Sequence, residues 1–107
     1  DEILKTEYSD DFDQKRKHAM VLSYDKYGKA SLNYPQNVDA IASLKKRLAL
    51  YEQTGNSDYL VDVANFAMLE FMFPRREGAY FKSGTEKDSP GVVGLSVGEA
   101  RDFDAGY

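Results

Sequence analysis

The chain has 107 residues, no cysteine, no tryptophan and a single histidine, with 14 basic residues against 18 acidic ones. The lack of cysteine excludes thiol nucleophiles, disulfide frameworks and cysteine-ligated metal centres, and a lone histidine excludes multi-histidine metal sites. A formal net charge of −4 argues against broad binding to a nucleic-acid backbone, which requires a basic face.

A chain of this length suits one domain, 1–107, with a core that needs no metal or disulfide. No targeting signal opens the sequence. Its most apolar run, 59–73, contains polar residues and is shorter than the ~20 residues of a membrane span. We therefore expect a cytoplasmic protein that does not bind membranes.

The first predicted helix covers residues 10–27. Ser9 is a suitable N-cap, and acidic residues follow it in the first turn, where they oppose the positive end of the helix dipole. Gly28 stands where a left-handed residue would end the helix. The segment 29–36 is expected to be a connecting loop.

The second predicted helix covers residues 38–54, with Asn37 as its N-cap and Gly55 at its end. Four apolar residues at steps of three, four and three predict one buried stripe: Ile41, Leu44, Leu48 and Tyr51. Polar residues are expected to face away from that stripe: Lys45, Lys46, Arg47 and Glu52.

The third predicted helix covers residues 58–73, is capped by Asn56 or Ser57 and stops at Pro74. Apolar residues occupy almost its whole circumference, which predicts the central and most buried helix. The short turn before it makes it antiparallel to the second helix. Two neighbours cannot cover all of its apolar surface, so we expect a homodimer.

The sequence therefore predicts an all-α fold with a three-helix antiparallel core in a helical body, 9–74, followed by a loop-rich tail, 75–107. Six of the eight glycines fall in this tail. A capping box formed by Ser96 and Glu99 predicts a short C-terminal helix at 97–103.

A polar stripe on the third helix is the first candidate site. At 100° per residue, Asp58, Asp62 and Asn65 lie within about 60° of one another, and Glu70 lies to one side. Such oxygen ligands suit Mg²⁺, which leaves waters for a phosphate substrate to displace. The alternative is structural: Asp58 opposes the helix dipole, Asp62 pairs with a lysine or arginine, and Asn65 is a hydrogen-bonded core amide.

The end of the first helix is the second candidate site. Lys26 can meet a phosphate there, and Tyr24, Tyr27 and Tyr34 can form a stacking wall for a base. Equally, Lys26 can simply complement the negative end of the helix dipole.

Three further features favour structural explanations. His18 has no partner motif and is expected to be solvated or half-buried. The basic cluster 45–47 is typical of a solvated helix face, with contact to phosphate or an acidic partner as the alternative. The segment 83–85 lacks the strand, the Gly-Lys-Ser/Thr ending and the helix of a P-loop.

Several short motifs between residues 25 and 70 carry a family resemblance: Lys26-Tyr27-Gly28, Asn33-Tyr34, Thr54-Gly55, and Leu60, Ala64 and Asn65. In this order the pattern resembles the phage and bacterial dATP/dGTP diphosphohydrolases, which are MazG-like all-α nucleotide pyrophosphohydrolases. Together with the tail around 88–91, it is also similar to small phage-encoded proteins.

The resemblance implies a dimer that holds Mg²⁺ with carboxylates from two adjacent helices and cleaves a nucleoside triphosphate between its α- and β-phosphates. The implied metal ligands are Asp62, Asp58 and Glu52. The implied substrate-binding residues are Lys26, Tyr27, Asn33 and Asn65. No catalytic residue is assigned.

The sequence also departs from the family pattern. MazG-like enzymes usually carry Glu-x-x-Glu on one helix and Glu-x-x-Asp on the next. Here 44–47 offers no carboxylate, and 59–62 retains only Asp62. The depleted ligand set argues for weak or absent catalysis.

The alternative is a catalytically silent helical protein that binds a host or phage protein. A Mg²⁺ ion at Asp58 and Asp62 would favour the enzyme. An Asp62 neutralised by Arg47 or Lys46 would favour the binding protein.

Overall fold

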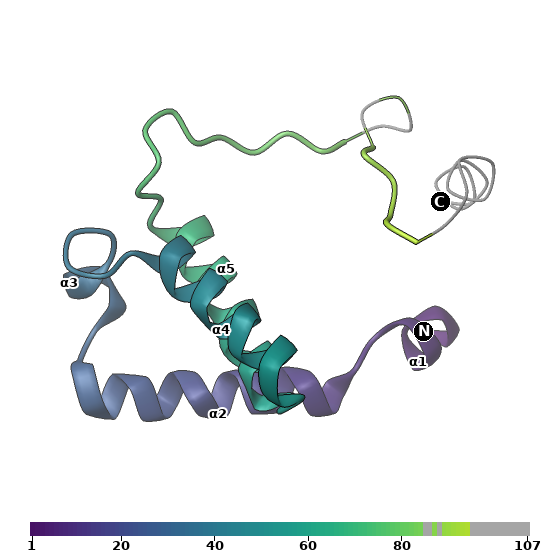
Figure 1. Ribbon diagram of the computed structural model, residues 1–107, viewed down its shortest axis with the longest axis horizontal. Coiled ribbons are helices and arrows are strands. Elements are labelled where there is room, and N and C mark those ends of the chain that lie inside the picture. Colours follow the sequence, from purple (N-terminus) through teal and green to yellow (C-terminus); the bar gives the residue numbers. More distant parts are fainter. Residues whose placement is uncertain (85–86, 88, 95–107) are drawn as a thin grey trace. The chain divides into compact units, whose positions relative to one another are not determined.

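The computed structural model describes residues 1–84, 87 and 89–94, and every regular element in that part of the chain is a helix. The predicted all-α fold is therefore confirmed. The elements are α1 (Glu2–Glu7), α2 (Asp10–Tyr27), α3 (Ala30–Asn33), α4 (Ala40–Thr54) and α5 (Asp58–Met72). The chain divides into two units, Asp1–Glu77 and Gly78–Tyr107, and all five helices belong to the first (Figure 1).

Helix α2 has the bounds that the sequence predicts. The Ser9 hydroxyl accepts a hydrogen bond from the Phe12 amide at 3.0 Å, which satisfies one of the free donors of the first turn. At the other end, the Gly28 amide donates to the Tyr24 carbonyl at 2.8 Å. Gly28 has φ 79° and ψ −162°, so its φ is positive as expected, but its ψ is not that of a left-handed helical residue.

Helix α4 begins two residues later than predicted because its N-cap is Asp39 rather than Asn37. The Asp39 carboxylate accepts from the Ala42 amide at 3.0 Å. The Asn37 amide instead donates to the Asn33 carbonyl at 2.9 Å, within the preceding loop. Gly55 ends the helix in the left-handed conformation, as predicted, with φ 73° and ψ 6°.

Helix α5 begins at Asp58, as predicted, and ends one residue before the predicted boundary. Its N-cap residue, Ser57, makes no side-chain capping bond. The Asn56 side chain accepts from the Asp58 amide at 3.0 Å instead, so Asn56 holds the first turn. Pro74 follows the C-cap residue Phe73 and prevents the helix from continuing.

Helix α5 is the most buried element of the described chain. It packs against α4, to which it runs antiparallel, and α2 crosses the pair (Figure 1). The buried side chains of α5 recur every four residues: Val61, Asn65 and Leu69. The described residues contain one further buried residue, Ala40 on α4. The prediction of a central third helix is confirmed, and the core around it is small.

The face of α4 that meets α5 differs from the predicted stripe. Ile41 and Leu48 are 39% and 40% exposed, although the pattern placed them inward. Arg47, expected on the solvent side, is half-buried. The buried and half-buried positions of α4 are 40, 43, 44, 47, 50 and 51, which form one helical stripe that includes Leu44 and Tyr51 of the predicted set. The apolar pattern of the sequence does not mark Ala40 and Arg47 as inward-facing, because Ala40 is small and Arg47 is charged.

Two short helices were not predicted. Helix α1 is capped by Asp1, whose carboxylate accepts from the Ile3 amide at 3.0 Å. Helix α3 occupies the segment expected to be a loop, 29–36. Neither is long enough to show an apolar period. The predicted helix 97–103 lies outside the described residues.

Within the described residues, no helix has both the length and the apolar character needed to cross a bilayer.

Candidate functional site

The contact between α4 and α5 carries an ion pair at the centre of the candidate metal site. Arg47 Nε donates to Asp62 Oδ2 at 3.1 Å, and each side chain is 32% exposed. The Arg47 guanidinium carbon also lies 5.6 Å from the centroid of the Phe66 ring, within cation–π range. The carboxylate of Asp62 is therefore balanced by a cation of the same chain.

Tyr34 belongs to the surroundings of the same arginine. Burial raises the pKa of its phenol, and the positive charge of Arg47 opposes that rise. The half-buried Tyr34, in the loop before α4, thus lies close enough to Arg47 to feel its positive charge.

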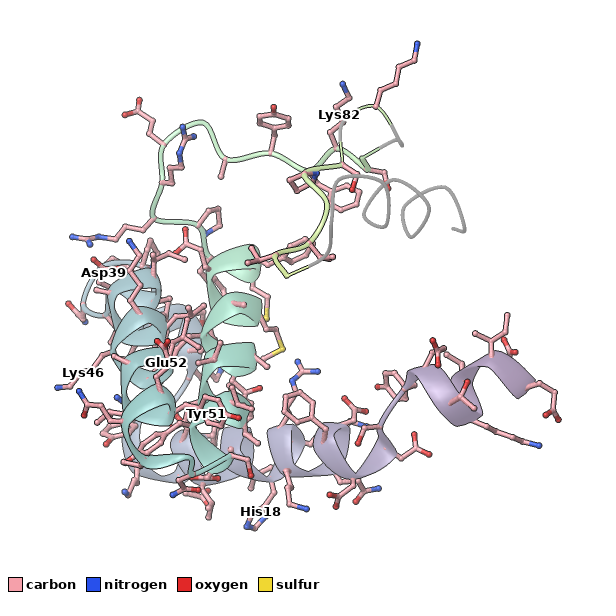
Figure 2. All side chains as sticks on the ribbon, turned by 45° about the vertical axis from the view of Figure 1, so that its right-hand side comes forward. His18, Asp39, Lys46, Tyr51, Glu52 and Lys82 are labelled. Carbon is pink, nitrogen blue, oxygen red and sulfur yellow. The ribbon has the colours of Figure 1, made fainter. Side chains whose placement is uncertain are left out.

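The other two predicted metal ligands are not gathered around Asp62. Asp58 is exposed in the first turn of α5, and Glu52 is exposed near the end of α4 (Figure 2). Across residues 1–84, 87 and 89–94, no three carboxylate or imidazole side chains stand close enough to hold a metal ion. Asp58 and Asp62 share one helix face, as the sequence predicts, but Asp62 is turned to Arg47.

Asn65 connects α5 to α2 through both ends of its amide. Its Nδ2 donates to the Arg16 carbonyl at 3.1 Å, and its Oδ1 accepts from Arg16 Nε at 3.3 Å. The side chain is 6% exposed, so these bonds satisfy polar atoms that water cannot reach. This geometry matches the structural interpretation of Asn65 as a hydrogen-bonded core amide.

Arg16 is the residue of this region that sequence reasoning missed. Besides Asn65, it contacts two other side chains. Its Nη1 lies 3.3 Å from the Asp13 carboxylate on its own helix, and its Nη2 lies 3.4 Å from the Met68 sulfur. The available signal was its position on the same helix face as Met20, four residues later. Arg16 thus joins α2 to α5 through its hydrogen bonds to Asn65 and Met68.

The candidate phosphate and base site at the end of α2 lies elsewhere. Asn33 Nδ2 donates to the Tyr27 carbonyl at 3.0 Å and to the Lys29 carbonyl at 3.4 Å, which holds the turn between α2 and α3. Lys26 is exposed, and Tyr27 is 70% exposed. The structure therefore brings Asn33 to Tyr27.

Asn65 is not part of that group. It meets α2 at Arg16, and ten residues of helix, or about 15 Å at 1.5 Å per residue, separate Arg16 from Lys26. The four predicted substrate-binding residues consequently fall in two places rather than one.

The remaining basic residues of the helices face solvent. His18 is exposed and points away from α4 and α5, and Lys46 points outward from α4 (Figure 2). Lys45 is exposed as well. The expectation of a solvated basic face holds for these two lysines and is wrong for Arg47.

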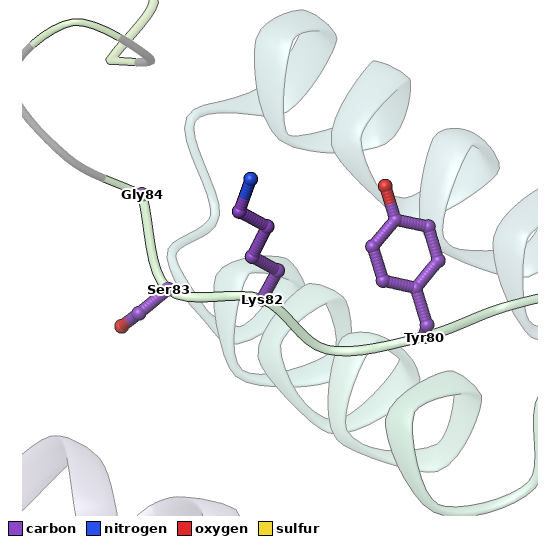
Figure 3. A pocket seen from close by; sticks show the side chains of 4 residues that line it. All are labelled: Tyr80, Lys82, Ser83 and Gly84. Atoms are coloured by element: carbon purple, nitrogen blue, oxygen red, sulfur yellow. The ribbon is translucent and has the colours of Figure 1, made fainter.

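The second unit presents a shallow surface pocket along one extended stretch. Four residues line it: Tyr80, Lys82, Ser83 and Gly84 (Figure 3). All four are exposed, and Tyr80 is 83% exposed. The Lys82 and Ser83 side chains point to opposite sides of the backbone, and the helix N-terminus of a phosphate-binding loop is absent from this stretch (Figure 3).

Comparison with family models, curated proteins and solved structures finds no match to this chain.

Proposed function

We propose that this chain acts as a small helical interaction protein that binds another protein surface, rather than as a metal-dependent nucleotide pyrophosphohydrolase. The observation that carries the proposal is the size of the core. Ala40, Val61 and Leu69 are the buried apolar residues of the described chain. Large apolar side chains on several helices stay exposed, among them Ile3, Leu22, Tyr27 and Leu32.

An exposed apolar surface of this extent favours association. Burial of apolar area is the main favourable term in both folding and binding. With three buried apolar residues in the described part of the chain, folding alone buries little apolar surface, and contact with another protein surface would bury more.

The state of the candidate metal ligands supports the same proposal. Arg47 already compensates the charge of Asp62 at 3.1 Å. A metal ion at Asp62 would have to displace that guanidinium and then recruit further oxygens, because Glu52 and Asp58 do not join it in a cluster. The sequence lacks most of the carboxylates of the family pattern, and in the structure Arg47 pairs with the one that remains, Asp62. Both observations favour the interaction protein over the pyrophosphohydrolase.

The alternative function, a metal-dependent nucleotide pyrophosphohydrolase, is tested by assaying the wild-type chain and the Asp62→Asn variant. We expect no Mg²⁺-dependent release of pyrophosphate from any dNTP. We also expect Asp62→Asn to lower the melting temperature by the same amount with and without Mg²⁺, since it weakens a contact to Arg47. Glu52→Gln is the matched control, because it removes an exposed carboxylate of the predicted ligand set and should leave the melting temperature unchanged.

The opposite outcome would overturn the proposal. It consists of Mg²⁺-dependent pyrophosphate release by the wild-type chain that falls at least about tenfold in Asp62→Asn while the variant remains folded.

A further inference from the structure

Helix α2 has a second face that its contact with α5 leaves unused. The contact with α5 involves Arg16, which lies on the side of Met20. Val21 lies about 140° from Arg16 around α2 and is 59% exposed. Tyr24 lies between these two sides, about 80° from Arg16 and about 60° from Val21, and is 56% exposed. No residue of α2 is buried, although the helix has 18 residues.

The exposed face contains a ridge of three residues at intervals of four: Lys17, Val21 and Asp25. Each interval of four residues advances about 40° around the helix, so the three form one continuous row. All three are exposed. The row carries a positive charge at one end, an aliphatic side chain in the middle and a negative charge at the other end.

Such a row is complementary to a reversed copy of itself. We propose that two copies of the chain associate through antiparallel α2 helices, with the two-fold axis passing next to Val21. The proposal rests on the proposed interaction function and names its partner, a second copy of this chain. The sequence predicted a dimer that forms through the apolar face of the third helix. The present proposal places the dimer interface on α2 instead.

The antiparallel arrangement uses the commonest mode of helix packing, in which rows of residues four apart from two helices lie alongside each other. Reversing one copy about Val21 places Lys17 beside Asp25 of the partner subunit. The two-fold symmetry repeats that contact, so two equivalent ion pairs flank a centre formed by Val21 of both copies, with Tyr24 at its edge. A parallel arrangement would instead set Lys17 against Lys17 and Asp25 against Asp25.

Lys17 is accessible for this contact. Its ammonium group lies 3.5 Å from Asp13 on the same helix, and its side chain is 76% exposed. A pair this exposed contributes little to the fold and leaves the lysine able to reach a second carboxylate.

Charge reversal tests the arrangement by sedimentation equilibrium of the full chain. We expect the wild-type chain to dimerise, and Lys17→Asp and Asp25→Lys each to raise the dimer dissociation constant at least about tenfold, because two attractive contacts become repulsive. Mixing these two variants should restore dimers that contain one copy of each, since both contacts are then attractive again. The neutral variants Lys17→Gln and Asp25→Asn should weaken the dimer less.

Lys15→Asp is the matched control. It makes the same charge change on the same helix and also removes an ion pair four residues apart, with Asp11, but it lies about 120° from Val21 around the helix. It should leave the dimer dissociation constant unchanged. The helical circular dichroism signal shows whether each variant has folded.

Three results would overturn the inference: a monomeric wild-type chain, folded charge-reversal variants that dimerise as well as the wild type, or a mixture that fails to form the mixed dimer. None of them bears on the pyrophosphate assay. Conversely, Mg²⁺-dependent turnover of dNTPs that falls at least about tenfold in folded Asp62→Asn would overturn the proposed function whatever the oligomeric state.

Discussion

Helices α5 and α2 meet in the same unit but are held by different kinds of contact. Helix α5 buries Val61, Asn65 and Leu69, whereas α2 buries none of its residues. The specific bonds between these two helices run through Arg16 and are polar. The difference teaches that α4 and α5 form the stable part of the unit, while α2 is attached by a few directional bonds and retains exposed surface for another contact.

The largest expected effect comes from breaking the buried side of this comparison. Leu69→Ala removes a side chain that is 4% exposed and should lower the free energy of unfolding by about 2 to 4 kcal/mol, from lost burial and the cavity left behind. Leu48→Ala, at a position that is 40% exposed, should cost under about 1 kcal/mol. Urea denaturation of both variants measures the contrast. Equal losses of unfolding free energy in the two variants would contradict the placement of Leu69 in the core and of Leu48 outside it.

The next effect breaks the attachment of α2. Asn65→Leu removes both amide bonds to Arg16 and leaves the Arg16 carbonyl without that donor, which should cost about 1 to 3 kcal/mol. Thermal unfolding provides the measurement. Asn56→Leu is the comparison, since it removes one exposed bond at the first turn of α5 and should cost less. A larger loss for Asn56→Leu would show that the Asn65 bonds do not hold α2.

The ion pair between α4 and α5 should matter less because both partners are partly solvated. Arg47→Gln removes the cation that balances Asp62 and stacks on Phe66, with an expected loss of about 1 kcal/mol. Lys46→Gln, one residue earlier and exposed, should change stability by under about 0.5 kcal/mol. Indistinguishable melting temperatures for the two variants would contradict a structural role for Arg47.

The smallest effect concerns the cap of α4 and depends on pH. The hydrogen bond from the Ala42 amide, aided by Arg75, lowers the pKa of Asp39 below its ordinary value of 3.8. A lowered pKa in the folded state means that the ionised carboxylate stabilises the fold above this ordinary value, and that this contribution is lost as the pH falls through the lowered pKa. Asp39→Asn keeps a capping oxygen without the charge.

The melting temperature of Asp39→Asn should therefore lie below that of the wild type at neutral pH, and the gap should close on acidification below 3.8. A gap that stays constant over this pH range would show that the charge of Asp39 does not contribute.

The helices that could be predicted from the sequence are those with both a period and end signals. Ser9 and Gly55 marked ends that the structure confirms, and the apolar circumference of 58–73 identified the most buried helix. The inner face of α4 was predicted only in part: Leu44 and Tyr51 are half-buried as expected, but Ile41 and Leu48 are exposed. Arg47 lies inward because it has a partner on another helix. No pattern within one helix reveals such a partner.

The candidate site divides in the same way. The pairing of Asp62 with a basic residue and the core role of Asn65 could be stated as alternatives from residue type and position alone. For Arg16 the sequence offers only its helix face, shared with Met20, and not its partner, because its bonds to Asn65 join residues 49 positions apart. Contacts over such separations depend on how α2 crosses α5, which a single sequence does not specify.

Hydrogen exchange followed at low and high protein concentration tests the central claim most directly, because it reads α2 and α5 separately in one sample. The account predicts that amides around Val21 in α2 exchange fast in dilute solution and gain protection as the concentration rises. It also predicts that amides around Asn65 in α5 are protected throughout and gain less. Exchange in α2 that does not change with concentration would contradict association through this helix.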